Sequence, residues 1–355
     1  MNTMFGRKRK KRGNYPYTVT RVKAKKSLLI KEEEYNKLLM MSLPEISRYM
    51  SESGYQKEMS ELASRMEGID LVEYAAYLNM SRVFKEILDA SDGDLRTMIS
   101  AYLDKWNVWN VKVILRGKSF GLDDKSIRED LVPAGSLKEA QLEKLLALPM
   151  IEEILTEYGR MDSIAIPEDI VTSYSDTGSL SRIEDFLDKF RYSRLLESII
   201  PDSKPTAALL DYVRHDIDVV NFSTIMKLKA EGIHGEQVMQ YIIPNGKQLD
   251  RKKSLNLANI DSMTAVAGEI AQLDFYENIK DILESPDVSV RAIESALKKY
   301  EMGLAKEFSH MNPLSVAPVV DFMINKETEV FNILAIARGR QSGIPPETIK
   351  ELLVI

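Results

Sequence analysis

The sequence predicts an all-α protein built from three similar helical units. The first observation behind this prediction is a residue pattern that recurs every 111 residues along the 355-residue chain. The second is that each copy of the pattern closes with basic residues followed by a glycine, which is typical of a helix C-terminus. The third is the lack of any stretch of alternating apolar and polar residues, bounded by turns, that would indicate a strand.

The repeated pattern begins with an asparagine and ends with a glycine eleven residues later. Basic residues stand six and eight positions after each asparagine, and an apolar residue follows each glycine. The asparagines are Asn110, Asn221 and Asn332, the glycines are Gly121, Gly232 and Gly343, and the first basic residues are Arg116, Lys227 and Arg338. A helix stop followed at once by a new helix start predicts that each unit ends in a tight helix–turn–helix.

The chain opens with a basic segment. Residues 1–26 hold ten Lys or Arg and no acidic residue, although the whole chain has a net charge of −6. We predict that residues 1–16 form a flexible basic tip. The run Arg7–Arg12 has the charge to contact nucleic acid or anionic lipid, and a solvated tail is the plainer interpretation.

The first helical unit is predicted to span residues 17–135. Its apolar residues recur at helical spacing, and Asp92-Gly93 interrupts the chain before the helix that carries Asn110. Upstream of this break, glutamates recur at nearly the same interval as the main pattern. They are Glu73, Glu184 and Glu294.

The second and third units are predicted to span residues 136–246 and 247–355. The second unit opens with a capping-box-like start at Ser136–Glu139. Its segment Pro167–Ser181 is rich in Ser, Thr, Asp and Gly, and we expect it to be a loop between two helices. The break of the third unit lies at Met311–Pro313.

Three similar units in one chain favour a closed arrangement, because equivalent faces can meet around an approximate threefold axis. We therefore predict a pseudo-threefold, funnel-like assembly of helical domains. A linear stack of units is the alternative. Short repeats of the kind that build such stacks would show further self-similarity inside each unit, and none is seen.

The composition indicates a globular protein of a reducing compartment. Hydrophobic residues make up 44% of the chain and charged residues 29%, and there is no cysteine. Disulfides, thiolate zinc sites and cysteine nucleophiles are thereby excluded. No apolar run reaches the roughly 18 residues that a membrane helix needs, and the N-terminus has no apolar signal core. We expect a soluble intracellular chain.

No catalytic, metal or cofactor site is predicted. Gly117-Lys118-Ser119 resembles the end of a phosphate loop, but Lys112 stands where that loop needs a glycine. The tripeptide also lies at a predicted helix C-terminus, whose field repels anions. The three histidines have no ligand spacing. An enzyme would need a pocket unique to one unit, and His215 and Asp216 would be the place to look.

The repeated asparagine is interpreted as a buried side chain that fixes the packing within its unit by hydrogen bonds. Its neighbours differ between copies, with Trp106 and Trp109, Val220, or Phe331 beside it, so a ligand site shared by all three units is not indicated. The basic residues that follow are interpreted first as stabilising the C-terminus of the helix. If the units close into a ring, Arg116, Lys227 and Arg338 would also form a charged rim, and we name them as a candidate interface.

Several segments, in order and at matching separations, carry a resemblance to a known family. They are Tyr17–Ala24 with Leu28 and Leu29, Trp106–Lys118 with Gly121, Pro133–Gly135, Asn332–Gly339, and Gly343–Pro345 with Glu347. Together they resemble the C subunit of the archaeal-type rotary ATP synthase, also called A-type or bacterial V-type, which is similar to the d subunit of the eukaryotic vacuolar ATPase. The resemblance covers nearly the whole chain from Tyr17. Lys23 and Asn107 depart from it, since arginine and aspartate are usual there.

The resemblance implies a non-catalytic adapter in the central rotor. Such a protein sits on the membrane proteolipid ring, receives the foot of the central shaft and transmits torque for ATP-coupled proton or sodium transport. It implies the shaft subunits and the proteolipid ring as partners, no nucleic acid, no cofactor, and a peripheral position at the cytoplasmic face of the cell membrane. The alternative is a helical scaffold or adapter whose basic tip binds nucleic acid or anionic lipid.

Overall fold

The structure, a computed structural model, describes residues 12–260, 262 and 265–355. All regular secondary structure in these residues is helical, and no strand occurs among them. The predicted all-α fold class is confirmed.

The helices follow one another in an order that repeats three times: short helices, two long helices, and one short helix. Their bounds are α1 Tyr15–Lys26, α2 Glu32–Leu38, α3 Leu43–Ser51, α4 Gln56–Leu62, α5 Gly68–Ala90, α6 Gly93–Ser119, α7 Asp124–Glu129, α8 Glu139–Leu146, α9 Ile151–Asp162, α10 Glu168–Val171, α11 Ser173–Thr177, α12 Ser181–Ser198, α13 Lys204–Ala230, α14 Glu236–Met239, α15 Arg251–Asn259, α16 Val266–Ile270, α17 Tyr276–Leu283, α18 Val290–Met311, α19 Ala317–Gln341 and α20 Pro346–Leu352. The pairs of long helices are α5 with α6, α12 with α13, and α18 with α19.

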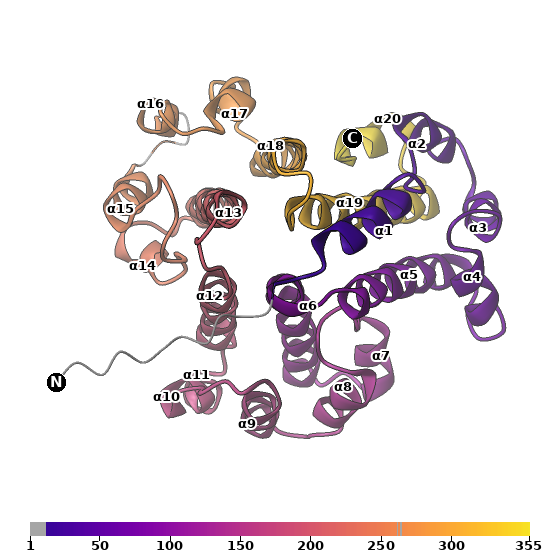
Figure 1. Ribbon diagram of the computed structural model, residues 1–355. Helices are drawn as coiled ribbons and strands as arrows, with labels where there is room; N and C mark the ends of the chain where they lie inside the picture. The colour runs from indigo at the N-terminus through magenta and orange to yellow at the C-terminus, as the bar shows by residue number, and fades with distance from the viewer. Residues whose placement is uncertain (1–11, 261, 263–264) are drawn as a thin grey trace.

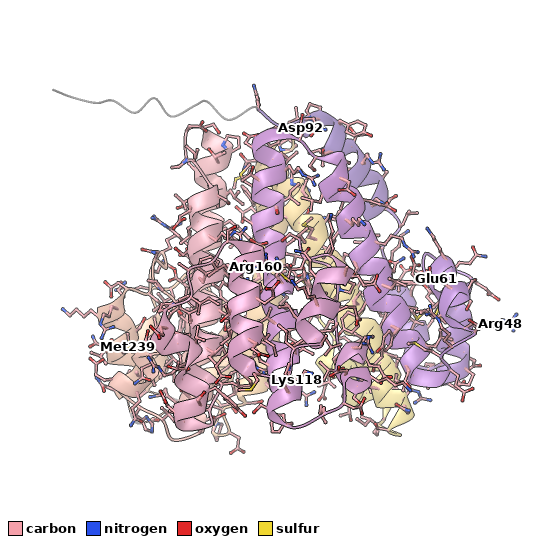
Figure 2. All side chains as sticks on the ribbon, turned by 90° about the horizontal axis from the view of Figure 1, so that it is seen from below. Arg48, Glu61, Asp92, Lys118, Arg160 and Met239 are labelled. Atoms are coloured by element: carbon pink, nitrogen blue, oxygen red, sulfur yellow. The ribbon has the colours of Figure 1, made fainter. Side chains whose placement is uncertain are left out.

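The long helices form a closed ring. Each contacts the next, in the order α5, α6, α12, α13, α18 and α19, and α19 contacts α5 again. They lie toward the middle of the molecule, whereas the short helices gather at its periphery (Figure 1). Asp92, which directly precedes α6, and Lys118, in its last turn, lie at opposite ends of the molecule (Figure 2), so α6 spans its whole length.

The second long helix of each unit ends at the repeated glycine. Gly121, Gly232 and Gly343 have φ angles of +70°, +78° and +69°, the left-handed region in which glycine avoids the strain of a side chain. The amide that follows each glycine donates back to a carbonyl in the last turn of the helix. In the first unit, the Leu122 N–H donates to the Gly117 carbonyl at 2.9 Å. This turn reverses the chain while carbonyl groups in the last turn of the helix keep hydrogen-bond partners.

The sequence predicted a loop at residues 167–181, and this expectation was wrong. The structure places two short helices there, α10 and α11, and it buries Ser173. Helices of four and five residues are unstable alone and depend on tertiary packing, in this case against α9 and α12. The polar composition of the segment could not reveal that support.

The predicted basic tip lies only partly within the described residues. The run Arg7–Arg12 lies outside them except for Arg12. Helix α1 begins at Tyr15, inside the range expected to be flexible. Just before it, the Gly13 N–H donates to Asp94 Oδ1 at 2.5 Å, and Asn14 Nδ2 donates to the Ala90 carbonyl at 2.8 Å. The end of the tip is therefore bound to the connection between α5 and α6.

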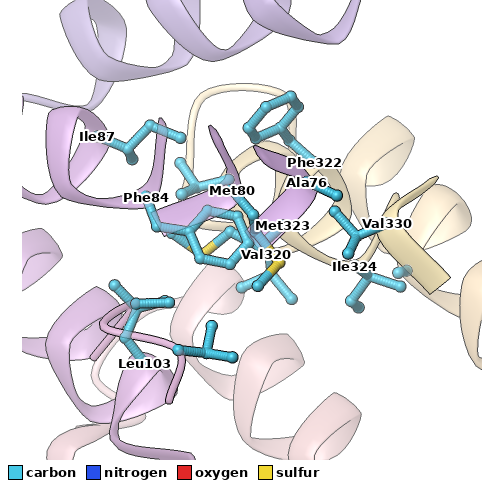
Figure 3. Close-up of a cluster of buried hydrophobic side chains, with 14 of the residues drawn as sticks. Ala76, Met80, Phe84, Ile87, Leu103, Val320, Phe322, Met323, Ile324 and Val330 are labelled. Atoms are coloured by element: carbon cyan, nitrogen blue, oxygen red, sulfur yellow. The ribbon is translucent and has the colours of Figure 1, made fainter. Parts of the chain in front are cut away.

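Each hydrophobic core joins elements of neighbouring units as well as elements of one unit. We call the contact of a second long helix with the first long helix of the next unit a seam; the three seams are α6–α12, α13–α18 and α19–α5. One core joins the end of α6 and α7 to α8, α9 and α12. A second joins the end of α13 and α14 to α15–α18. The third and largest contains the α19–α5 seam, where Met80 and Phe84 pack against Val320 and Met323 (Figure 3).

Candidate functional site

The three repeated asparagines make the same pair of hydrogen bonds. Each side chain donates to one backbone carbonyl and accepts from the N–H of the same residue, 22 positions further on. The bonds are Asn110 with Val132 at 2.8 and 2.7 Å, Asn221 with Ile243 at 2.8 and 2.8 Å, and Asn332 with Val354 at 2.9 and 3.0 Å. All three side chains are buried. Each therefore holds the extended segment after the short closing helix against the long helix.

A second repeated contact binds the start of the next unit. The residue three positions before each asparagine accepts a backbone N–H from the segment that leads into the next set of short helices. The pairs are Asn107 with Leu137 at 3.0 Å, Asp218 with Leu249 at 3.0 Å, and Glu329 with Ile30 at 2.6 Å. The third pair joins the last unit to the first, so this set of contacts runs around the ring.

Ion pairs cross all three seams at equivalent positions. Arg116 pairs with Glu184 through two hydrogen bonds, with Nε at 2.7 Å from Oε1. Lys227 pairs with Glu294. Arg338 also pairs through two bonds, with its Nη2 at 2.7 Å from Glu73 Oε2. The candidate interface residues thus bind the glutamates whose recurrence the sequence shows.

The seam between the last and the first unit holds a buried charged cluster. Glu329 is 3% and Lys326 is 5% exposed. The two side chains form an ion pair at 2.6 Å, and the Tyr55 hydroxyl donates to Glu329 at 2.5 Å while accepting from Lys326 at 2.9 Å. Burial raises the pKa of Tyr55 well above its usual value, and the Glu329 charge adds to this. The cluster fastens the segment α1–α4 onto α19.

A cavity of about 980 Å³ lies beside four of the six long helices. Its walls come from α6, α12, α18, α19, and from α20 with the segment after it. Trp106 and Trp109 meet edge to face at 6.3 Å between ring centroids, and Trp109 and Phe331 are 46% and 51% exposed. Half-exposed aromatic rings in a hollow are typical of binding sites.

Charged side chains surround these rings. Lys105 pairs with Glu327 at 2.6 Å, Lys112 with Asp188 at 2.5 Å, and Lys298 with Glu301 at 3.2 Å. Burial lowers the pKa of Lys105. Burial also raises the pKa of Glu301 to about 7, against the attraction of Lys298 and with the help of the Asp216 charge.

Glu301 makes stability depend on pH. Because its pKa is higher in the folded chain than the usual 4.5, the folded state binds more protons between pH 4.5 and about 7. The free energy of unfolding should therefore fall as the pH rises through that interval. Glu301→Gln is expected to raise the free energy of unfolding by roughly 1–3 kcal/mol above pH 7 and to change it little near pH 4.5.

Urea denaturation at a series of pH values measures this effect. Glu307→Gln, on the exposed face of the same helix, is the matched control and should leave the pH profile unchanged. Parallel profiles for wild type and Glu301→Gln would contradict the prediction.

The other sequence candidates do not assemble into one site. Gly117-Lys118-Ser119 forms the last turn of α6, where Lys118 pairs with Asp124 at 2.7 Å. His215 Nε2 lies 2.9 Å from Lys247 Nζ, and burial lowers the pKa of His215. Its neighbour Asp216 instead accepts a hydrogen bond from Tyr192 at 2.8 Å.

Sequence reasoning missed most of the cavity wall. Arg191, Arg291 and Lys298 lie on first long helices, and nothing in their local pattern separates them from surface charges. The aromatic residues beside the repeated asparagines were a usable signal, because large apolar side chains on one helix face have to meet a core or a partner.

Among the described residues, no helix is long and apolar enough to cross a membrane. In the described residues, the fold and the site define an all-α protein whose long helices contact one another in a closed ring, with a cavity lined by four of them. A family model described as ATP synthase (C/AC39) subunit matches residues 18–352. The chain belongs to this family.

Relatives match this chain over nearly their whole length. The A-type ATP synthase C subunit of Methanosarcina acetivorans is 32% identical over 351 residues, which covers 98% of this chain and 95% of the relative. The corresponding C subunit of Haloferax volcanii is 33% identical, with 96% and 98% coverage, and that of Archaeoglobus fulgidus is 32% identical, with 97% of each covered. The chain is therefore a component of a rotary ATP synthase, and its partners are other subunits of that membrane-associated complex.

Proposed function

We propose that this chain is the rotor adapter between the central shaft and the proteolipid ring. It sits on the ring at the cytoplasmic face of the membrane, holds the foot of the shaft in its central cavity and transmits torque for ATP-coupled ion transport. It has no active site of its own in this role. The observation that carries the proposal is the closed ring of long helices, four of which line a cavity of about 980 Å³, in a chain of this family.

An adapter that transmits torque must not open under load. Between each unit and the next, a hydrophobic core, a backbone-to-side-chain hydrogen bond and an ion pair act together, and the last seam adds the Glu329 cluster. Since packed interiors deform little, a ring closed in this way passes a rotation from one face to another. These features support a mechanical role.

The predicted funnel shape and charged rim belong to the same proposal. The side chains of Arg116, Lys227 and Arg338 are more than half exposed although each is paired, so each has free donors for carboxylates of a neighbouring protein.

In this proposal Arg338 has two roles, an ion pair with Glu73 across the seam and a contact with a partner subunit. A charge swap separates them. In Arg338→Glu combined with Glu73→Arg, the seam is expected to keep its stability, whereas affinity for the partner should fall several-fold.

The swap is measured by thermal unfolding and by the amount of partner subunits that co-purify. Glu73→Arg alone serves as the control for the broken seam pair. Unchanged partner recovery with the swapped pair would remove Arg338 from the interface.

Purification of the tagged full-length chain from its native membranes, in mild detergent, tests the adapter role. Recovery of shaft subunits together with the proteolipid ring is expected, and the purified chain should hydrolyse no ATP. Recovery of neither partner from membranes whose ATPase is intact would overturn the proposal. Salt-sensitive binding of DNA or anionic vesicles that is lost on removing residues 1–13 would instead favour the scaffold alternative.

A further inference from the structure

The closing segment of the second unit contains the one asparagine of the sequence that glycine follows, Asn245. Its side chain is exposed and makes no hydrogen bond within the described residues. Its φ angle is +71°, and among the described residues other than glycine only Ser163 shares a positive φ. Asparagine adopts this left-handed conformation more readily than most residues, although at some cost. Asn245 is thus exposed, unpaired and conformationally unusual.

Packing requires a glycine directly after Asn245. A Cβ added to Gly246 would lie 2.2 Å from Asp218 Oδ1, so no side chain fits there. In the first unit Gly135 approaches the side chain of Asn107 in the same way, but Ala134 precedes it. The repeated structure therefore needs the glycine and does not need an asparagine before it.

The chain is held firmly on both sides of this dipeptide. On one side Ile243 exchanges two hydrogen bonds of 2.8 Å with the side chain of Asn221. On the other side the Asp218 carboxylate accepts the backbone N–H groups of residues 247–249 at 3.1, 2.7 and 3.0 Å. Between these two attachments the Gly246 N–H donates no hydrogen bond within the described residues. A change in the length of this short arch would therefore act on both attachments.

An asparagine before glycine is open to attack by the backbone, because glycine has no side chain to hinder the approach. The Gly246 nitrogen bonds to Cγ of Asn245, the Cγ–Nδ2 bond breaks, and the Gly246 amide proton leaves with Nδ2 as ammonia. Water then opens the five-membered imide ring by adding hydroxyl to one carbonyl carbon and a proton to the ring nitrogen. The product is aspartate or isoaspartate, according to which carbonyl reacts.

We propose that Asn245 is a site of spontaneous deamidation, and that the isoaspartate formed there loosens the contact between the second and third units. Isoaspartate adds one carbon atom to the backbone of the arch. The bonds of Asp218 to residues 247–249, which hold the start of the third unit, are then pulled out of register. This inference does not depend on the adapter role.

Peptide mapping by mass spectrometry, on the purified full-length chain kept in mildly alkaline buffer, tests the modification. The product is expected to form several-fold faster at Asn245 than at Asn278, an exposed asparagine of α17 that is followed by the branched Ile279. The rate should rise with pH, because the attacking amide must lose its proton. Mapping also separates this product from isoaspartate formed at Asp92-Gly93, the one Asp-Gly pair of the sequence. Equal rates at the two asparagines, or no product at Asn245, would overturn the inference.

The melting temperature of the same samples tests the structural consequence. It should fall by several degrees in the wild type as isoaspartate accumulates. Asn245→Gly is the matched control, since glycine accepts the positive φ and has no side-chain amide to lose. The melting temperature of this variant should stay constant through the same incubation. Isoaspartate at position 245 without a fall in the melting temperature would refute the loosened contact.

Asn245→Asp separates the added charge from the added backbone atom. The variant carries the negative charge of both products but keeps the normal backbone length, so it should lower the melting temperature less than the isoaspartate does. An equal fall in Asn245→Asp would show that the charge alone weakens the contact, and the backbone argument would be wrong.

Discussion

Glu329→Ala is expected to lower the free energy of unfolding by about 3–5 kcal/mol. The substitution leaves the ammonium of Lys326 buried without its carboxylate, and it removes the acceptor of the Tyr55 hydroxyl and of the Ile30 N–H. Breaking a buried ion pair from one side is costly because the remaining charge stays in a medium that solvates it poorly. Chemical denaturation measures the loss.

The matched control is Glu294→Ala. Its ion pair with Lys227 holds an equivalent seam but lies at the surface, so its removal should lower the free energy of unfolding by no more than about 1 kcal/mol. Limited proteolysis adds a local measurement, since cleavage within residues 15–62 should accelerate in Glu329→Ala only. Equal losses in both variants would show that burial does not set the strength of the last seam.

The second large expected effect is a loss of stability when a repeated asparagine is replaced, as in Asn110→Ala, Asn221→Ala and Asn332→Ala. Each removes both partners of a buried backbone N–H and carbonyl, at a cost of about 2–5 kcal/mol. Because the hydrogen-bond geometry is the same in the three units, the three losses should agree within about 1 kcal/mol.

Asn325→Ala is the control for these variants. Its side chain is partly buried and donates to Asp321 one turn earlier in the same helix, so it makes no direct hydrogen bond to a distant backbone segment. Its loss should remain below about 1 kcal/mol. A large loss of unfolding free energy in only one of the three asparagine variants would contradict the prediction, because the hydrogen-bond geometry is the same in all three.

Local features of the fold were predictable from local residues. The glycines after the basic residues have left-handed backbone angles, and the breaks near Asp92-Gly93 and Met311–Pro313 separate long helices, because capping and chain reversal depend on residues within one or two turns. The short helices α10 and α11 were missed for the converse reason, since their stability comes from neighbours far along the chain.

The candidate site was predictable only in part. The sequence shows the recurrence of Arg116, Lys227 and Arg338 and the recurrence of the glutamates. It does not show that each basic residue pairs with a glutamate of the following unit. The residues of the cavity wall were even harder to predict from the sequence. Its charged residues lie on helices from all three units, and their separation in the sequence carries no sign of their meeting.

The all-α class, the stops that end the second long helices, the threefold repetition of the sequence pattern and the family all follow from the order of the residues. The packing of the whole chain was needed to show that the cores join neighbouring units, that Arg338 reaches back 265 residues to Glu73, and that the last unit closes on the first through Glu329. Helix formation depends on interactions along a few residues. An ion pair or a core contact exists only where the folded chain brings two side chains within a few ångströms, and residue identity alone allows many such partners.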